Sequence, residues 1–403
     1  MTFLPGGVTA AKGFKAAGIH CGIRKNRTKK DLALIVSDTP ASAAAVYTRN
    51  LVKGAPIAVT AAHIADGKAQ AVICNSGIAN TCAADGVEKA EAMSRLADAL
   101  GLRAADVIVG STGVIGPSID LAPIEAGIPA LVAALSPNGG GDAAEAIMTT
   151  DTVKKEIAVP FTVGGVDCVL GGIAKGSGMI APNMATMLCF LTTDAAIAPA
   201  LLQDALRDVV VDTFNMMSVD GDTSTNDTVA IMANGAAGNA PVTEKGADYD
   251  AFAAALKTIC VQLCRELAAD GEGATKLLEC RVTGAKTKQD ARIVAKAVIE
   301  SSLLKAAMFG EDANWGRVLC AIGYSGADVD IHGVETAFES TAGRVVVCEK
   351  GAGIAFSEEL AAKVLHEKEI VIDIKLSDGS ANATAWGCDL TYDYVKINGD
   401  YRT

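Results

Sequence analysis

Strand patterns and helix patterns alternate along most of this chain, and this alternation restricts the fold more than any other feature of the sequence. Residues Leu32–Asp38 and Ala69–Gly77 are apolar runs that end in turn residues, as buried strands do. Residues Gly86–Gly101 have the apolar spacing of a helix and end at a glycine. The sequence therefore predicts an α/β or α+β protein with at least two lobes.

The rest of the chain continues this alternation. Gly164-Gly165 separates two strand patterns and predicts a hairpin. Strong helix patterns run from Tyr249 to a stop at Asp270-Gly271 and over Ala291–Gly310. Further strands are predicted within the segments Ala105–Gly116, Leu188–Asp194, Gly343–Gly351 and Glu369–Thr391.

The amino-acid composition indicates how these helices and strands pack and which classes of binding partner are excluded. The 403 residues suffice for a large core, and half of them are hydrophobic although only 4% are aromatic. Ala, Gly and Val dominate the apolar residues, and such small side chains favour close packing of helices on sheets. A net charge of −12 argues against nucleic acid, which needs clustered Lys and Arg. A small acidic substrate needs only one or two local cations.

Targeting signals and metal motifs are not evident in the sequence. The chain starts without the basic and apolar regions of a signal peptide, and no apolar run reaches about 18 residues. We therefore expect a cytoplasmic protein without a membrane span. The eleven cysteines form no CxxC pair, and Cys260 and Cys264 are predicted to be buried thiols on one helix face. We expect no metal and no resident cofactor.

The segment KGSGMIAPNMATML, Lys175–Leu188, contains a glycine pattern and a lone hydroxyl that require interpretation. Its GSGMIA portion, Gly176–Ala181, fits a dinucleotide-binding pattern, but Pro182 follows where a helix should begin. We therefore reject the phosphate-loop interpretation. Thr186 has two further interpretations: a buried hydroxyl bonded to backbone, which is the commoner case, or a nucleophile.

The nucleophile interpretation has a specific chemical basis. If the Ala185–Thr186 bond breaks, Thr186 gains an α-amino group with a pKa of about 7.7–8.0, which can accept the proton of its own hydroxyl. The same hydroxyl could attack the carbonyl of Ala185 and cut the chain. Such a nucleophile needs donors aimed at the oxyanion. The segment GSTGVIG, Gly110–Gly116, could supply them, or it could be an ordinary turn.

These two segments together resemble the ornithine acetyltransferase / glutamate N-acetyltransferase family of arginine biosynthesis. The resemblance extends over nearly the whole chain, in family order. It includes the segments MTTDTVKKE (Met148–Glu156), GDTSTNDT (Gly221–Thr228), DGEGATK (Asp270–Lys276), FGEDANWGRVLCAIGYSG (Phe309–Gly326) and YVKINGDYRT (Tyr394–Thr403). Gly399 stands where alanine would be expected, at a position without a chemical role.

The resemblance implies a fold, a cleavage and a set of roles. The fold would be the α/β (α+β) sandwich of the self-cleaving DmpA-type aminopeptidases, with an N-terminal nucleophile. Cleavage between Ala185 and Thr186 would give an α-chain of residues 1–185 and a β-chain of residues 186–403, which would assemble as an α2β2 heterotetramer. Thr186 would be the nucleophile, and Thr112 and Gly113 would form the oxyanion hole. Substrate would contact Thr149, Lys175, Thr186, Glu272, Asn398 and Thr403.

The implied reaction is a ping-pong transfer of acetyl from N2-acetylornithine to glutamate through acetyl-Thr186. The resemblance leaves open whether acetyl-CoA also serves as donor. A self-cleaving aminopeptidase or amidase of the same fold is the first alternative, and a non-catalytic ligand-binding protein that uses GSGMIA is the second. The complete set of substrate-binding residues favours the acetyltransferase.

Overall fold

The computed structural model describes residues 2–181 and 187–400, and these residues form two compact units. The first unit comprises Met1–Gly176, Pro182–Val211 and Thr223–Leu263. The second unit comprises Ser177–Ala181, Asp212–Asp222 and Cys264–Thr403. These units do not follow the predicted cleavage products, because residues from both sides of Thr186 build the first unit.

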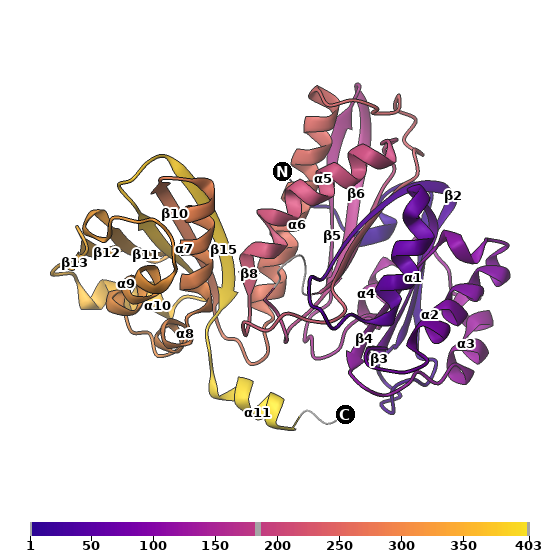
Figure 1. Cartoon of the computed structure of the whole chain (residues 1–403), viewed down its shortest axis with the longest axis horizontal. Coiled ribbons are helices and arrows are strands. Elements are labelled where there is room, and N and C mark those ends of the chain that lie inside the picture. The colour runs from indigo at the N-terminus through magenta and orange to yellow at the C-terminus, as the bar shows by residue number, and fades with distance from the viewer. Residues whose placement is uncertain (1, 182–186, 401–403) are drawn as a thin grey trace. The chain divides into compact units, whose positions relative to one another are not determined.

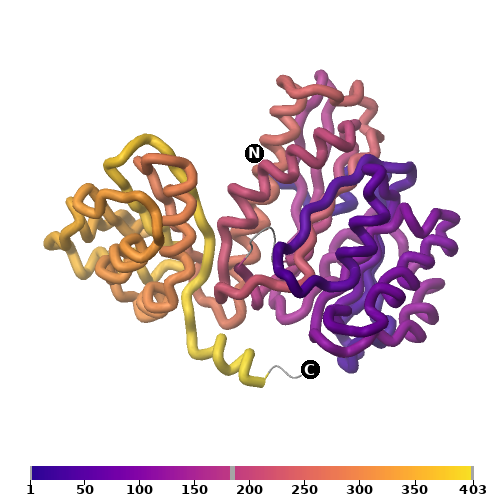
Figure 2. The backbone as a smooth tube through the Cα atoms, in the orientation of Figure 1, coloured from indigo at the N-terminus to yellow at the C-terminus, as the bar shows by residue number. Residues whose placement is uncertain are grey.

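A mixed sheet of eight described strands forms the centre of the first unit (Figure 1). The strand order is β4-β3-β2-β9-β7-β6-β5, and β1 pairs with β2. The members are β1 (Phe14–Ile19), β2 (Leu32–Tyr47), β3 (Lys68–Ile78), β4 (Val107–Val114), β5 (Lys155–Val163), β6 (Val166–Lys175), β7 (Leu188–Thr193) and β9 (Thr228–Ala233). In Figure 2 the early and the later segments of the chain run side by side within this unit.

Both faces of this sheet are buried. Along β2, Ala33 and Ile35 belong to one core cluster, whereas Leu32 and Leu34 belong to another. Alternate residues of a strand point to opposite faces, so the sheet has a core on each side. The helices of this unit are α1 (Ala55–His63), α2 (Gly86–Ser94), α3 (Ala122–Ala133), α4 (Gly140–Ala146), α5 (Pro199–Val211) and most of α6 (Ala247–Ala269).

Small residues allow the close packing that the composition predicts. A Cβ atom at Gly18 would lie 2.0 Å from the carbonyl oxygen of Asp142 in α4. Alanines 143, 144 and 146 of that helix are completely buried against the sheet. Glycine and alanine therefore let α4 approach β1 more closely than larger side chains would.

The second unit has its own mixed sheet, with the strand order β13-β12-β11-β14-β10-β15-β8 among the described residues. Its strands are β8 (Met217–Ser218), β10 (Leu277–Ala285), β11 (Glu335–Ser340), β12 (Gly343–Glu349), β13 (Ala352–Gly353), β14 (Glu369–Lys375) and β15 (Ala381–Cys388). Its helices are α7 (Lys288–Glu300), α8 (Ser302–Phe309), α9 (Trp315–Tyr324), α10 (Glu358–His366) and α11 (Tyr392–Asp400).

Most predicted elements are present, with two differences. The predicted hairpin is confirmed, because β5 and β6 pair across Gly164-Gly165, where both glycines have positive φ. The single helix predicted over Ala291–Gly310 is wrong. Ser301 has extended dihedrals that end α7, and its hydroxyl caps α8 by accepting from the Leu304 amide. Strand β1 and the second half of β2 were not predicted.

No helix within residues 2–181 and 187–400 is long and apolar enough to cross a membrane. Cys260 and Cys264 are completely buried, as predicted. Among the described side chains, no group of three or more His, Cys, Asp or Glu residues is arranged to hold a metal ion.

Candidate functional site

The structure places the predicted site residues in both units. Four of them, Thr112, Gly113, Thr149 and Lys175, belong to the first unit, and Glu272 and Asn398 belong to the second. The remaining three, Ala185, Thr186 and Thr403, lie outside the described residues. We therefore describe the surroundings of each group within its own unit.

Thr112 and Gly113 lie near the end of β4, where its pairing with β3 becomes irregular. Ile78 pairs with both Thr112 and Val114, so the register shifts at this point. Gly113 has a φ of 132°, and a Cβ atom there would lie 2.2 Å from the carbonyl carbon of Gly77. Only glycine fits this position. The shift interrupts the regular ladder beside the two predicted oxyanion-hole residues.

Lys175 ends β6 and pairs with Leu188, the first residue of β7. These antiparallel strands hold both ends of the connection that contains the predicted cleavage bond. Within this connection, the described residues Gly176–Ala181 form no helix.

Asp151 links two of the predicted substrate-binding positions. Its carboxylate accepts the amide of Thr149 at 3.0 Å and the amide of Gly176, the neighbour of Lys175, at 2.7 Å. It also forms a buried ion pair of 2.8 Å with Lys155. Asp151 and Lys155 were not predicted as site residues, although both lie in the segment MTTDTVKKE.

Burial and neighbouring charges act in opposite directions on the pKa values of Asp151 and Lys175. Burial alone would raise the pKa of Asp151, but Lys175 and Lys155 hold it below its ordinary value. Burial lowers the pKa of Lys175, and the charge of Asp151 opposes that shift. The charges of two buried lysines therefore act on one buried carboxylate, and among the described contacts only Lys155 forms an ion pair with it.

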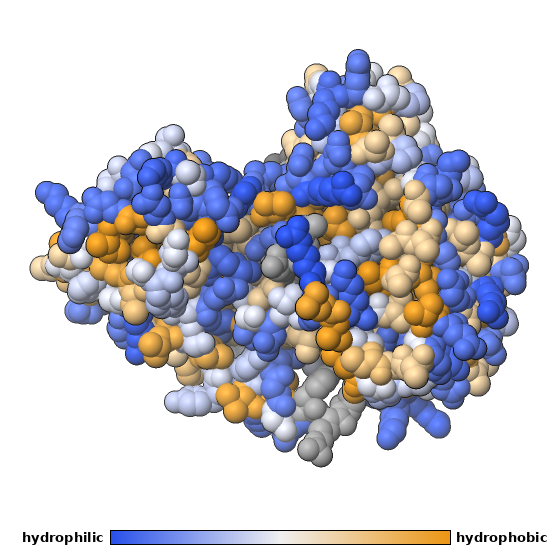
Figure 3. Space-filling model, in the orientation of Figure 1, coloured by the Kyte–Doolittle hydropathy of each residue, from blue (hydrophilic) through white to orange (hydrophobic). Residues whose placement is uncertain are grey.

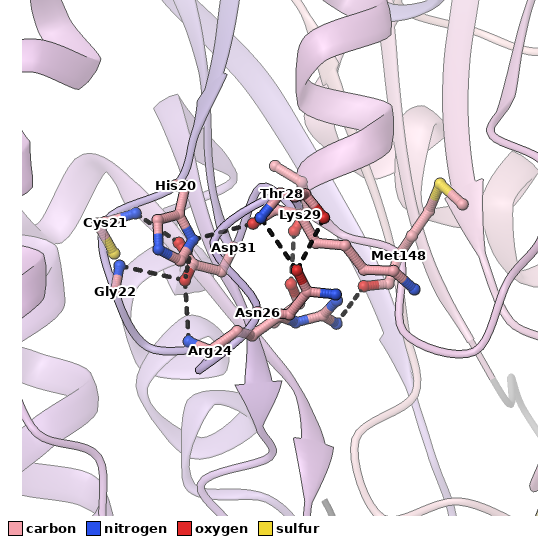
Figure 4. A network of polar contacts seen from close by, with 11 residues as sticks. His20, Cys21, Gly22, Arg24, Asn26, Thr28, Lys29, Asp31 and Met148 are labelled. Atoms are coloured by element: carbon pink, nitrogen blue, oxygen red, sulfur yellow. Dashed lines mark hydrogen bonds and ion pairs between the residues drawn. The ribbon is translucent and has the colours of Figure 1, made fainter.

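A second polar network supports the backbone next to Thr149 (Figure 4). The completely buried carboxylate of Asp31 accepts the amides of Cys21, Gly22 and Arg24, at 2.6, 3.2 and 2.9 Å. This fixes the loop that carries Arg24, whose guanidinium donates to the carbonyl of Met148. The sequence has no local signal for this link, because Arg24 and Met148 lie 124 residues apart.

Asp227 is a buried acid that lies directly before β9, the strand next to β7. The first residue of β9, Thr228, pairs with Leu188. The Met187 amide donates to the Asp227 carboxyl group. Its Oδ2 atom is buried without a hydrogen-bond partner in the described structure. Burial raises the pKa of Asp227 well above its ordinary value, although hydrogen bonds from Ser224 and Thr48 oppose the shift.

In the second unit, the structure brings Glu272 and Asn398 together. The Asn398 side-chain amide donates to the Glu272 carboxylate at 2.7 Å. The Glu272 amide donates to the carbonyl of Ser177 at 2.8 Å. A Cβ atom at Gly178 would lie 2.4 Å from the Glu272 carboxyl group, so the glycine makes room for this side chain.

Asp220 and Tyr394 hold the same part of the second unit in place. Asp220 accepts the amides of Met179 and Ile180 at 2.6 and 2.8 Å, and the hydroxyl of Tyr394 at 3.2 Å. Burial and the Asp220 charge raise the pKa of Tyr394. These bonds connect the glycine-rich segment to α11, which carries Asn398. Sequence reasoning did not identify Asp220 or Tyr394.

A cavity of about 570 Å³ lies in the first unit beside α1 and the start of α2. Its wall includes Gly54, Ile57, Asn80 and Val87. Figure 3 shows apolar side chains on the surface over α1. None of the described site residues lines this cavity, so it is separate from the groups above.

The chain is similar in sequence to a known protein family along most of its length. The sequence profile of the ArgJ family matches residues 15–403. The arginine biosynthesis bifunctional protein ArgJ of Symbiobacterium thermophilum is 54% identical over 406 residues, which cover 100% of both chains. The corresponding Bacillus subtilis protein is 49% identical and covers 99% of this chain and 97% of its own.

A crystal structure of the arginine biosynthesis bifunctional protein ArgJ from Bacillus halodurans is also similar. It has 46% sequence identity and a TM-score of 0.51, and the match covers 54% of this chain and 100% of that chain. This likeness, together with the mixed sheets and their covering helices, confirms the predicted α+β sandwich.

Proposed function

Because the chain belongs to the ArgJ family, we propose that it is an acetyltransferase of arginine biosynthesis. It moves an acetyl group from N2-acetylornithine to glutamate and releases ornithine and N-acetylglutamate. The main support for this proposal is the family match over residues 15–403, together with 54% identity along the whole length of a bifunctional ArgJ. The word bifunctional in the names of the relatives supports a second activity, transfer of acetyl from acetyl-CoA to glutamate.

We propose a ping-pong mechanism in which Thr186 carries the acetyl group. Its hydroxyl attacks the acetyl carbonyl of N2-acetylornithine while its own α-amino group accepts the proton. The amide C–N bond breaks, ornithine leaves with a proton, and an acetyl ester remains. The glutamate amine then attacks the ester, and its C–O bond breaks to restore the hydroxyl. The Thr112 hydroxyl and Gly113 amide would stabilise the oxyanion of each step.

The charged residues of the predicted set have the chemistry to bind charged substrate groups. Lys175, a buried lysine whose charge acts on Asp151, can pair with a substrate carboxylate. Glu272, which already accepts a bond from Asn398, can pair with an ammonium group of ornithine. We assign Thr149 and Thr403 to substrate hydrogen bonds on the family resemblance.

We also propose that Thr186 is generated by cleavage of the Ala185–Thr186 bond. The Bacillus halodurans chain supports this, because its full length corresponds to 54% of this chain. Residues 186–403 amount to the same share of the 403 residues, about 54%. The products would be an α-chain of 1–185 and a β-chain of 186–403. We expect them to assemble as an α2β2 heterotetramer in the cytoplasm, without a resident cofactor.

The deciding experiment incubates the purified protein with N2-acetylornithine, with and without glutamate. We expect ornithine release to depend on glutamate and to equal N-acetylglutamate formation. Release of free acetate at equal rates in both reactions would instead indicate a hydrolase and would refute the transferase proposal. A parallel reaction with acetyl-CoA and glutamate tests the second activity.

Substitution of the nucleophile tests both proposed roles of its hydroxyl. We expect Thr186→Ala to stay uncleaved and to lose acetyl transfer, because neither reaction has a nucleophile. A denaturing gel would show one band near 41 kDa. Thr186→Ser, which keeps a hydroxyl, should still cleave. Cleavage of the Thr186→Ala chain would remove Thr186 from the mechanism.

A further inference from the structure

The segment GDTSTNDT has no role in the mechanism above, yet its Asn226 is fully used in hydrogen bonding. Its side-chain amide donates to the carbonyls of Ala79 at 2.5 Å and of Ser111 at 2.9 Å. Its carbonyl oxygen accepts the hydroxyls of Thr81 and Thr225, both at 2.6 Å. Two donors and two acceptor sites are the whole capacity of a carboxamide.

The chemistry of these partners determines the orientation of the Asn226 side chain. The NH₂ group faces two backbone carbonyls, which can only accept, and the oxygen faces two hydroxyls, which can donate. The opposite orientation would place three carbonyl oxygens against one another. Asn226 is also largely buried, at 8% exposure, so its contacts are internal.

The two carbonyls that Asn226 joins lie on either side of the irregular pairing between β3 and β4. Ala79 follows the end of β3, and Ser111 precedes Thr112 on β4. Between them, the register shift at Ile78 and the positive φ of Gly113 interrupt the ladder. Beyond the shift the Ala79 amide still donates to the Val114 carbonyl at 2.9 Å, and the Asn226 carboxamide adds two further bonds across the irregular pairing.

We propose that Asn226 is a positioning residue that fixes the Thr112–Gly113 segment in the geometry required of an oxyanion hole. It acts through the Ser111 carbonyl and not by touching substrate, because all four of its hydrogen-bond positions are occupied. This inference rests on the proposed function, and it adds a residue of the segment Gly221–Thr228 that bonds to β4 next to Thr112.

The strand geometry predicts a specific kinetic effect for Asn226→Asp. The carboxylate has nearly the same shape, but it cannot donate to the Ala79 and Ser111 carbonyls and would repel them. Oxyanion contacts act in the transition state, so kcat should fall while KM stays within about twofold. Complete loss of one oxyanion-hole donor lowers kcat by about 10²–10³-fold. Asn226→Asp would only displace the Thr112 and Gly113 donors, so we expect kcat to fall by about tenfold to a hundredfold.

Gly54 offers a second variant that leaves Asn226 intact. A Cβ atom at Gly54 would lie 2.6 Å from the Asn226 amide nitrogen, and the φ and ψ of Gly54, −62° and 141°, accept alanine. Gly54→Ala would therefore push the carboxamide out of place without removing a hydrogen-bonding group. We expect the same fall in kcat, of smaller size, with KM unchanged.

Two matched controls separate positioning from general damage. Asn239 is another buried asparagine of the first unit, and its amide joins the carbonyls of Ala196 and Ala240 at 3.3 and 2.8 Å. Asn239→Asp is the control for Asn226→Asp. Gly246 has no atom within 4 Å of an added Cβ, so Gly246→Ala is the control for Gly54→Ala. We expect both controls to keep kcat within about twofold of wild type.

The experiment measures acetylornithine-dependent ornithine release, normalised to cleaved enzyme, together with the rate at which each precursor cleaves and its unfolding midpoint. Lowered kcat and slower cleavage in Asn226→Asp and Gly54→Ala, but not in the controls, would support the inference. Wild-type kcat in both variants would overturn it while leaving the proposed function intact. The inference would also be overturned if the loss of kcat in the four variants simply followed the decrease in their unfolding midpoints. A wild-type protein without transfer activity would overturn both proposals.

Discussion

Two buried aspartates of the first unit have pKa values shifted in opposite directions, so they predict opposite pH dependences. Asp151 has a depressed pKa because Lys175 and Lys155 outweigh the effect of burial. Its contribution to stability is present above the unfolded-state pKa of about 3.9 and is lost as pH falls further. Asp227 has a raised pKa because burial dominates. Its folded form keeps a proton that the unfolded chain loses, so stability declines as pH rises above about 3.9.

We expect Asp151→Asn to destabilise the first unit by about 3–5 kcal/mol at pH 7, because it removes one charge of a buried ion pair with Lys155. Urea unfolding would measure the loss, which should shrink below pH 4. Glu359→Gln is the control, since Glu359 and Lys363 form an exposed pair on α10, and it should change stability by less than about 0.5 kcal/mol. An equal effect of both substitutions would contradict the argument.

For Asp227→Asn, we compare the free energy of unfolding with that of wild type between pH 4 and pH 8. The amide cannot ionise, so the variant should become more stable relative to wild type as pH rises through this interval. A difference that is flat, or that falls with pH, would show that the raised pKa of Asp227 does not exist in the folded protein.

At the scale of elements, the boundary between α7 and α8 depends on one hydroxyl. Ser301 Oγ accepts the Leu304 amide at 3.3 Å and caps α8. We expect Ser301→Ala to cost about 1 kcal/mol in urea unfolding, as the loss of an N-cap usually does. Ser302 is exposed and makes no such cap, so Ser302→Ala should be within about 0.5 kcal/mol of wild type. If both variants unfold alike, the cap does not determine this boundary.

The same elements show which parts of the fold were predictable. The helix stop at Asp270-Gly271 and the Gly164-Gly165 turn are local signals, and both occur where expected. The break at Ser301 was missed because the apolar spacing continues through it, so periodicity alone indicated one helix. Strand β1 was missed because its burial comes from pairing with β2 and from packing under α4.

At the scale of the whole molecule, the order of strands determines what cleavage would do. Strands β7 and β9 come from residues 186–403, yet they lie inside the first sheet, between β2 and β6 of residues 1–185. Ladders on both sides hold them: β2 pairs with β9, and β6 pairs with β7. Cleavage of the Ala185–Thr186 bond would therefore leave a sheet built from both products.

We expect the two products to co-elute in size-exclusion chromatography and to separate only in denaturant. On a denaturing gel they should run at about 19 and 22 kDa, in proportion to 185 and 218 of the 403 residues in 41.0 kDa. The Thr186→Ala protein should elute at the same volume as the cleaved wild type, but it should run as one intact chain on the denaturing gel. Separate elution of the fragments under native conditions would contradict the shared sheet.

The sequence by itself determined the alternating α and β elements, the glycine turns, the family and the identity of the expected nucleophile, because these depend on local patterns or on long matching strings. Only the tertiary structure revealed Asp151 between Lys155 and the backbone of Thr149 and Gly176, the link from Arg24 to Met148, and the bridge of Asn226 between Ala79 and Ser111. These contacts join residues that β-sheet pairing and packing bring together from distant parts of the chain. Burial and partners, which a residue's type and spacing do not specify, then set the opposite pKa shifts of Asp151 and Asp227.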